Sequence, residues 1–227
     1  MRVQEGKIIK GKAVGSPAAV SETDSAGGIK AGKEKPKVVR LFIGLELPPA
    51  VKVRVHKMAG PVLSRIQKGK LTDADNYHLT VFFIGEVTEE AVAAWKECVA
   101  EAAEVSDAFE LTLCNTGFFS RKNRKILWFG SEASDRLEAL YKHVMAAADK
   151  TLFTLGKPAV STQPGASRPF RPHVTLGREI VAEDDAVTLR TEKIKVRIET
   201  LTLFESKRIS GRLMYVPIAI GRLRERL

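Results

Sequence analysis

Cysteine and histidine are scarce in this sequence, and no long apolar run occurs in it. Among 227 residues there are two cysteines and four histidines. Cys98 and Cys114 belong to no CxxC pair and no Cys/His cluster, which argues against a disulfide framework and against a zinc site. Both fall within apolar patterns, so we interpret them as small core residues. The sequence therefore predicts a protein of a reducing compartment, with no metal and no cofactor.

Segments that direct a chain to a membrane are also missing. No stretch approaches the roughly 20 apolar residues that span a bilayer. Near the N-terminus, residues 7–10 are far too few for the apolar region of a signal peptide. We therefore expect a cytoplasmic protein that does not bind a membrane.

The charge of the chain is unbalanced toward the basic side. Lys and Arg number 37 against 27 Asp and Glu, which gives a formal net charge of +10. Residues 1–37 carry +4 of this charge, so residues 38–227 keep +6 and are basic in their own right. Such an excess suggests a polyanionic partner, but it does not identify one.

Composition divides the chain near residue 37. Residues 1–37 are rich in Gly, Ala, Ser and Lys and contain no aromatic residue. Such a segment buries too little apolar surface to offset the entropy lost on ordering. We interpret residues 1–37 as a disordered basic extension and residues 38–227 as one folded domain.

Strands and helices alternate through the rest of the chain. A buried strand is predicted over 38–45, followed by a helix that Pro48-Pro49 open and Gly60-Pro61 should break or kink. The further predicted elements are a strand over 77–85, a helix over 88–104, strands over 109–113 and 126–129, a helix over 134–150, a loop over 158–169, a strand from 173, and closing strands over 196–204 and 213–220. This order, without long parallel-sheet runs, favours an α+β fold with antiparallel sheets.

Two histidines are followed by a threonine at the second position. Alternate side chains of a strand share a face, so His78 and Thr80 point one way while the apolar residues between and after them point into a core. His173 and Thr175 repeat this arrangement 95 residues later, which is half of the 190 residues that follow residue 37. The spacing indicates a pseudo-symmetric duplication with one motif in each lobe.

The paired motifs suit the cleavage of a phosphodiester. In-line displacement needs a base for the attacking oxygen and an acid for the leaving oxygen, and two imidazoles that titrate near neutrality can fill both roles. The hydroxyls of Thr80 and Thr175 can donate to the non-bridging phosphate oxygens as negative charge develops there. This chemistry needs no metal.

Residues 77–85 (YHLTVFFIG) and 168–178 (RPFRPHVTLGR) resemble the paired signatures of the 2H phosphoesterases. The nearest branch is the LigT-type RNA 2′,3′-cyclic phosphodiesterases, also called 2′-5′ RNA ligase-like proteins. The similarity extends over residues 38–227 and includes the segments 40–43 and 203–206. The Arg-rich approach to the second motif is specific, whereas a single His-x-Thr is not.

The resemblance implies a bilobal fold in which two antiparallel sheets flank a central cleft, with helices outside. It implies that a monomer hydrolyses the 2′,3′-cyclic phosphate at an RNA end to a 2′-phosphate. By similarity His173 activates water and His78 protonates the departing 3′ oxygen, although the two roles could be reversed. Arg171 or Arg178 would hold the phosphate. Arg178 has the opposite parity to His173, so it reaches the cleft only if the strand bends or ends there.

Other observations keep the substrate open. Family members often have a basic residue where this chain has Phe82, so a phosphate contact is missing or an aromatic stacks on a base instead. The alternatives are a 2′-5′ RNA ligase, an enzyme for another cyclic nucleotide, and a non-catalytic protein that binds RNA ends. Less specific candidates are the basic turns 121–125 and 206–212, Phe118 and Phe119 as stacking residues, and His56 and His143 as surface or rim residues.

Overall fold

The computed structural model describes residues 36–160 and 169–225. In chain order the elements are β1 (Val38–Glu46), α1 (Pro49–Leu63), β2 (Lys68–Leu71), the 3-10 turn η1 (Ala74–Asn76), β3 (His78–Thr88), the 3-10 turn η2 (Glu89–Ala91), α2 (Val92–Glu104), β4 (Phe109–Arg121), β5 (Arg124–Ser131), α3 (Asp135–Thr154), β6 (His173–Val181), α4 (Asp184–Val187), β7 (Ile194–Ile198), β8 (Thr200–Ile209) and β9 (Arg212–Arg222).

Two sequence predictions fall largely outside the described residues. The predicted disordered extension lies outside them up to residue 35, and β1 begins at Val38. Most of the predicted loop over 158–169, with Arg168 of the second signature, lies outside them as well.

Local chemistry explains where the long helices begin and end. Pro49 opens α1, where its fixed backbone angle suits the first helical turn. Ser134 caps α3 by accepting a hydrogen bond from the Leu137 N–H at 3.3 Å. The predicted break at Gly60-Pro61 is wrong, because α1 continues to Leu63 with Pro61 inside it. Pro61 has no N–H to donate, so it removes one helical hydrogen bond, to the carbonyl four residues before it, and the helix ends two residues later.

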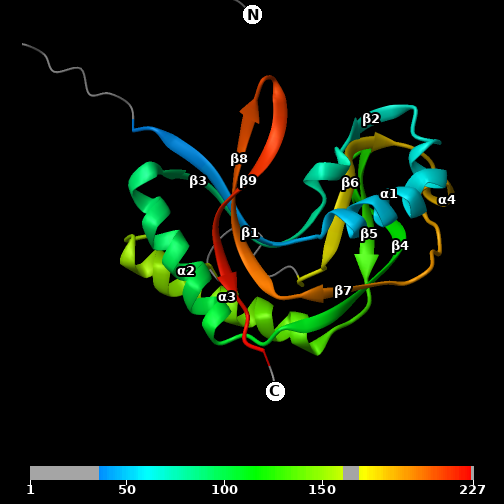
Figure 1. The fold of residues 1–227 in the computed structure, drawn as a ribbon. Helices are drawn as coiled ribbons and strands as arrows, with labels where there is room; N and C mark the ends of the chain where they lie inside the picture. The colour runs from blue at the N-terminus through cyan, green and yellow to red at the C-terminus, as the bar shows by residue number, and fades with distance from the viewer. Residues whose placement is uncertain (1–35, 161–168, 226–227) are drawn as a thin grey trace, which may run out of the picture. The chain divides into compact units, whose positions relative to one another are not determined.

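The nine strands of the described residues form one antiparallel sheet in the order β7-β4-β5-β6-β3-β1-β8-β9, with β2 added to β6 (Figure 1). The first half is β3, β1, β8 and β9, and the second half is β6, β5, β4, β7 and β2. The two motif strands β3 and β6 lie side by side at the centre, where the pair Leu79–Val174 joins them. The α+β prediction is confirmed, and the two predicted sheets are halves of one continuous sheet.

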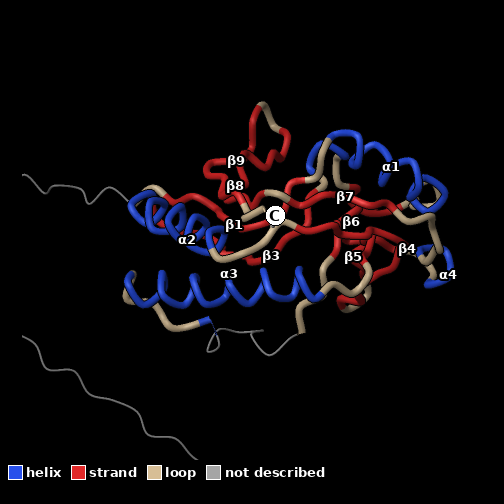
Figure 2. The backbone as a smooth tube through the Cα atoms, turned by 60° about the horizontal axis from the view of Figure 1, so that its bottom comes forward, coloured by secondary structure: helices blue, strands red, loops and turns tan. Residues whose placement is uncertain are grey.

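The helices cover the sheet in a pattern that relates the two halves. In each half a strand and a helix precede the motif strand: β1 and α1 come before β3, with β2 and η1 in between, and β5 and α3 come before β6. The strand and the motif strand pair antiparallel in both cases. α2 packs against α3, β8 and β9, whereas α3 contacts β3 and β4 and α1 contacts β7. Figure 2 shows α3 along one side of the sheet and α1 along the other. This arrangement agrees with the predicted duplication.

The apolar faces of these elements form one core. Its largest fully buried side chains include Trp95, Tyr77 and Phe129. Cys98 and Cys114 are buried and free, as the sequence predicts. No helix within the described part of the chain is long and apolar enough to cross a membrane.

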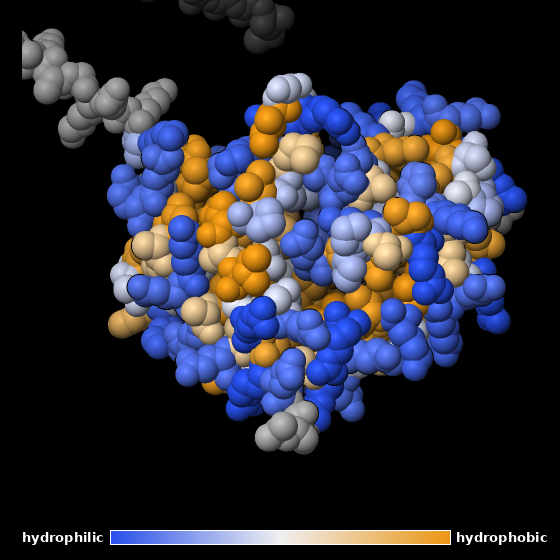
Figure 3. Space-filling view, in the orientation of Figure 1, coloured by the Kyte–Doolittle hydropathy of each residue, from blue (hydrophilic) through white to orange (hydrophobic). Residues whose placement is uncertain are grey.

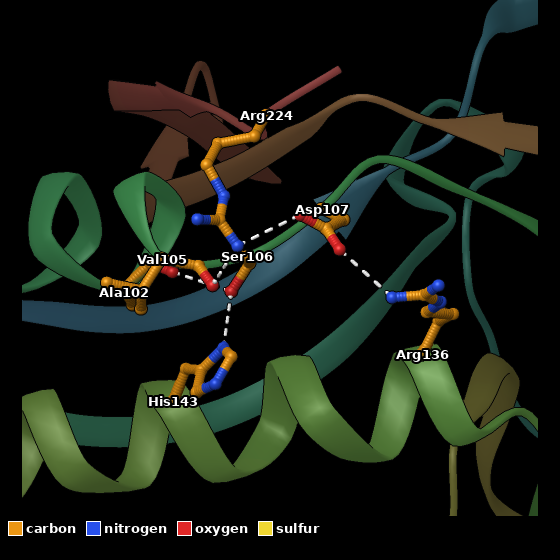
Figure 4. Close-up of polar contacts among 7 residues, drawn as sticks. All are labelled: Ala102, Val105, Ser106, Asp107, Arg136, His143 and Arg224. Carbon is orange, nitrogen blue, oxygen red and sulfur yellow. Dashed lines mark hydrogen bonds and ion pairs between the residues drawn. The ribbon is translucent and has the colours of Figure 1, made fainter. Parts of the chain in front are cut away.

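A polar joint ties the end of the chain to the helices (Figure 4). The Asp107 carboxylate pairs with Arg136 and with Arg224, each at 2.9 Å. The Ser106 hydroxyl donates to a backbone carbonyl of α2 at 2.7 Å. Its oxygen lies 2.9 Å from Nδ1 of His143, so the imidazole is the donor in that contact. His143, predicted at the surface or rim, thus lies in a structural joint, and Ser106 has no base to activate it.

Candidate active site

The β3 strand carries an extra residue directly after its threonine. Thr80 pairs with Gly44 and Phe82 pairs with Ile43, so two steps along β3 match one step along β1. Val81 is the additional residue of this β-bulge. A bulge of this kind reverses the alternation of side chains beyond it.

The β6 strand carries a bulge at the same place. Thr175 pairs with Trp128 and Gly177 pairs with Leu127, which makes Leu176 the additional residue. Beyond it Arg178 shares the face of His173, although simple alternation would place it on the opposite face. The bend that Arg178 requires is therefore present in the strand.

His78 is held by hydrogen bonds at both ring nitrogens. Nδ1 donates to the carbonyl of Asn76 at 2.7 Å, which leaves Nε2 without a proton in the neutral ring. Nε2 then accepts from the Thr80 hydroxyl at 2.9 Å. The strand thus presents a neutral imidazole whose Nε2 faces the hydroxyl group.

Asn76, the anchor of His78, is itself fixed by the β8–β9 hairpin. Its side-chain amide donates to the carbonyl of Leu213 at 2.8 Å and accepts from the N–H of Tyr215 at 3.3 Å. The residue is only 8% exposed. One buried amide therefore connects the C-terminal hairpin to the orientation of the His78 ring.

Aromatic rings from three strands surround His78. The ring centroids of Phe42, Tyr215 and Phe204 lie 4.7, 4.8 and 5.9 Å from its imidazole. Gly44 makes this packing possible, since a Cβ there would lie 2.8 Å from a backbone oxygen of β3 and 3.6 Å from the imidazole itself. His78 is consequently a largely buried group.

His173 repeats the inner part of this arrangement. Its Nδ1 donates to the carbonyl of Arg171 at 2.7 Å, so its Nε2 is also the free nitrogen of the neutral ring. Phe119 contacts its ring edge-on at 4.9 Å. The Trp128 ring lies over Gly117, where a Cβ would come within 2.3 Å of it. The Arg171 side chain is exposed, so its observed contact with the histidine is made by the backbone.

Burial and positive charge hold both imidazoles in the neutral form. Burial lowers the pKa of His78 to about 4, and the positive charges of Arg178 and Lys52 act in the same direction. Burial also lowers the pKa of His173, again with a contribution from Arg178. The charge of Arg178 therefore acts on both rings.

Figure 3 shows the surface hollowed between the β8–β9 hairpin and the second half, with hydrophilic side chains around it. Within residues 36–160 and 169–225, no group of three or more His, Cys, Asp or Glu side chains could hold a metal.

Several predicted candidates lie in other surroundings. Phe82 points to the back of the sheet, where its ring lies 6.0 Å from Trp95. His56 lies beside the Tyr77 hydroxyl at 3.3 Å. In the basic turns, cations are partnered within the chain, as Lys125 with Asp184, Lys207 with Glu205, and Arg212 with Asp73.

Sequence reasoning did not find Asn76 or the rings around the histidines. Asn76 stands two residues before His78, as Arg171 stands two before His173, and this repeated spacing is a usable signal. The rings of Phe42, Phe204 and Tyr215 gave no local signal, because strands distant in sequence bring them together.

Two adjacent His-x-Thr strands in an antiparallel sheet are the arrangement that the resemblance to the 2H phosphoesterases implies. The chain belongs to the 2′-5′ RNA ligase superfamily, whose family model matches residues 47–210. The predicted family is thereby confirmed.

Curated relatives and solved structures agree with this assignment. A Thermotoga maritima RNA 2′,3′-cyclic phosphodiesterase is 26% identical over 176 residues, which cover 72% of this chain and 88% of the relative. The Escherichia coli protein of the same name is 26% identical over 183 residues, or 79% and 93% of the two chains. The crystal structure of E. coli LigT complexed with 3′-AMP matches with a TM-score of 0.64 and 27% identity, over 82% of this chain and 99% of LigT. A Thermus thermophilus structure has the same fold, with a TM-score of 0.69 at 24% identity over 82% of this chain and 98% of that chain.

Proposed function

We propose that this chain hydrolyses the 2′,3′-cyclic phosphate at an RNA end to a 2′-phosphomonoester. The observation that carries the proposal is the matched state of the two histidines. Each uses Nδ1 to bind a backbone carbonyl two residues upstream and thereby leaves Nε2 for chemistry. The name shared by the curated relatives supports the substrate.

In the proposed reaction one imidazole takes a proton from water as the water oxygen bonds to phosphorus. The other gives a proton to the 3′ oxygen as its bond to phosphorus breaks, which leaves a 2′-phosphate and a 3′-hydroxyl. The family resemblance assigns the first role to His173 and the second to His78. Because both rings are neutral in the free enzyme, the acid takes up its proton together with the anionic substrate.

The remaining predicted residues have roles around the phosphate. The hydroxyls of Thr80 and Thr175 donate to its non-bridging oxygens, which for Thr80 means leaving Nε2 of His78. Arg178 is the better candidate for the phosphate cation, because its charge acts on both imidazoles. Arg171 orients His173, because its backbone carbonyl accepts the hydrogen bond from Nδ1 of that histidine.

The proposed enzyme is a cytoplasmic monomer that needs neither metal nor cofactor. Its substrate is the RNA end itself, and none of the proposed proton transfers involves a metal-bound water. The expected result is full activity after treatment with EDTA. Loss of activity on chelation, with recovery on adding a divalent cation, would contradict this part of the proposal.

A decisive assay uses end-labelled RNA that carries a 2′,3′-cyclic phosphate. Conversion to a 2′-phosphate by the wild type, with loss of conversion in H173A and H78A, supports the proposal. Joining to an added 5′-hydroxyl RNA would instead establish ligation at the same site. Tight binding without any turnover would make the chain an RNA-end-binding protein and would refute hydrolysis.

A further inference from the structure

A groove lies between helix α1 and the segment that leads into β7. It has a volume of about 490 Å³, and residues 189–192 form the wall that faces the helix. Arg54, Met58 and Pro61 line the groove from α1 because their spacing places them on one flank of the helix. None of the residues that line it belongs to the proposed active site, so the proposed reaction leaves this groove without a role.

The groove carries an excess of positive charge. Arg54 and Lys57 line it from α1, and Arg190 lines it from the opposite wall, against the single carboxylate of Glu192. Within residues 36–160 and 169–225 none of these three cations forms an ion pair. The cations of the basic turns differ from them, since they are partnered within the chain. Unpaired cations on facing walls repel one another, and an anion between them relieves that repulsion.

Apolar side chains and a fixed backbone complete the groove. Met58, Pro61 and Leu189 contribute apolar surface, which strengthens the field of the nearby cations because it is less polarisable than water. The wall of residues 189–192 is anchored to β4. The Thr191 hydroxyl accepts from the N–H of Asn115 at 2.8 Å, and the Thr191 N–H donates to the Asn115 side chain at 3.2 Å. A ligand therefore meets a wall that is already in place, which lowers the entropy lost on binding.

Helix α1 leads from the active site to this groove. Near its start, Nζ of Lys52 donates to the carbonyl of Asp75 at 2.7 Å, directly before the residue that anchors His78. Arg54 and Lys57 follow on the same helix. Lys57 is five residues beyond Lys52, which is about 8 Å along the helix at 1.5 Å per residue. A strand of several nucleotides whose end lies at the histidines can therefore extend to the groove, whereas a single nucleotide held there is too short.

We propose that the groove between α1 and residues 189–192 binds the phosphodiester backbone of the RNA strand whose end is processed at the histidines. The proposal rests on the proposed function and adds a second binding site to it. Several cations gain together from a polyanion, because each phosphate they neutralise releases condensed counterions. Contacts to phosphates carry no sequence information, so the groove favours a polymer over a cyclic mononucleotide without selecting its sequence.

The kinetic test compares wild type with the groove variant R54Q/K57Q/R190Q on two substrates. One is uridine 2′,3′-cyclic phosphate, and the other is a single-stranded RNA that ends in a 2′,3′-cyclic phosphate. At low salt the groove variant should have a KM for the RNA that is raised by roughly 10-fold, with kcat nearly unchanged. On the mononucleotide the two proteins should be alike. An equal rise of KM on both substrates would overturn the proposal, since it would show a general structural effect.

A control variant removes the same charge elsewhere. K96Q/K142Q/K157Q changes three exposed lysines, which belong to α2, to α3 and to the turn after α3. Helix α3 lies on the other side of the sheet from α1, as Figure 2 shows. This control should keep the KM of the wild type on both substrates. A loss on the RNA as large as that of the groove variant would overturn the proposal, because net charge alone would then explain the effect.

Equilibrium binding of a fluorescent RNA that ends in a 2′-phosphate tests the groove without turnover. Anisotropy titrations at several salt concentrations give the slope of log Kd against log salt. Loss of three phosphate contacts should reduce this slope by roughly 2, at about 0.7 for each contact with a single strand. A smaller slope for the groove variant than for the control would support the groove even if the wild type hydrolyses no cyclic phosphate, an outcome that would refute only the proposed function. Equal slopes and equal Kd values would overturn the groove as an RNA site.

Discussion

The two histidines share an inner geometry but differ in what supports it. In the first half the anchor of His78 is Asn76, a buried residue that the β8–β9 hairpin clamps through two hydrogen bonds. In the second half the anchor of His173 is Arg171, an exposed residue in the short segment before β6. The two halves thus share the hydrogen bond from histidine Nδ1 to a backbone carbonyl two residues upstream, but they differ in the residues that surround each histidine.

The halves also differ in how far they bury the imidazole. Three aromatic rings enclose His78 and lower its pKa to about 4, and the Thr80 hydroxyl occupies its Nε2. His173 has a ring contact with Phe119, and none of the described residues makes a bond to its Nε2. A rigid, enclosed imidazole thus faces a more accessible one across the junction of β3 and β6.

Removing either imidazole should have the largest effect. Both H78A and H173A should lower kcat by roughly 10² to 10⁴, because each variant lacks one proton transfer. The double variant should be little worse than the slower single variant, since the two groups act in one step. Single-turnover rates with circular dichroism as a fold control measure this. Full activity in either single variant would show that the two halves do not form one site.

Arg178 should matter more than Arg171. R178A removes the charge that acts on both imidazoles, so their pKa values should rise while phosphate binding weakens. We expect a loss in kcat/KM of roughly 100-fold, as for the loss of one charge-stabilising donor. R171A should be nearly silent because its carbonyl remains. NMR titration of the histidine rings measures the pKa change, and a larger effect in R171A would reverse the assignment.

Substitution of Asn76 should test whether the β8–β9 hairpin positions His78, since the corresponding residue before His173, Arg171, makes its contact through the backbone alone. N76A removes two hydrogen bonds to the backbone of β9, which should lower the free energy of unfolding by about 1–3 kcal/mol. It should also lower kcat more than KM, because the carbonyl that orients His78 is no longer clamped. N76D keeps the acceptor and should recover part of the stability. Unchanged kcat in a folded N76A protein would show that the hairpin does not position His78.

The burial of His78 should make the free energy of unfolding depend on pH below neutrality. The folded pKa of His78 is about 4, below the ordinary value of 6.5, so its neutral form stabilises the folded state above pH 6.5. Between pH 6.5 and pH 4 His78 is protonated in the unfolded chain but stays neutral in the folded protein. The free energy of unfolding therefore falls by at most about 1.4 kcal/mol per pH unit. Urea unfolding of wild type and H78Q checks this: the wild type should have the steeper dependence, and identical slopes would refute it.

The sequence indicated the candidate catalytic groups more readily than their surroundings. His78, Thr80, His173 and Thr175 could be found because a strand alternates its faces locally. The same rule gave Arg178 the wrong parity, because a bulge depends on pairing with a neighbouring strand and leaves no local pattern. For the same reason the sequence drew attention to Phe82, although Phe83 is the residue that shares the face of the histidines.

The fold was predictable to the level of class and repeat. Alternating elements and the half-domain spacing gave the α+β duplication. The continuity of the sheet was not predictable, because it depends on the single pair Leu79–Val174. Nor was the course of α1 past Pro61, since the position of a proline relative to a helix end decides its effect.

That junction has a mechanical consequence. A single residue pair between β3 and β6 constrains the distance between the two imidazoles only weakly. Helix α3, in contrast, contacts both β3 in the first half and β4 in the second. The helix therefore supports both halves of the sheet from behind and helps to fix the distance between the two imidazoles. Substitutions on the buried side of α3, such as at Val144, would therefore change the distance between the imidazoles, and with it the rate of the proposed reaction, without altering any group that contacts the substrate.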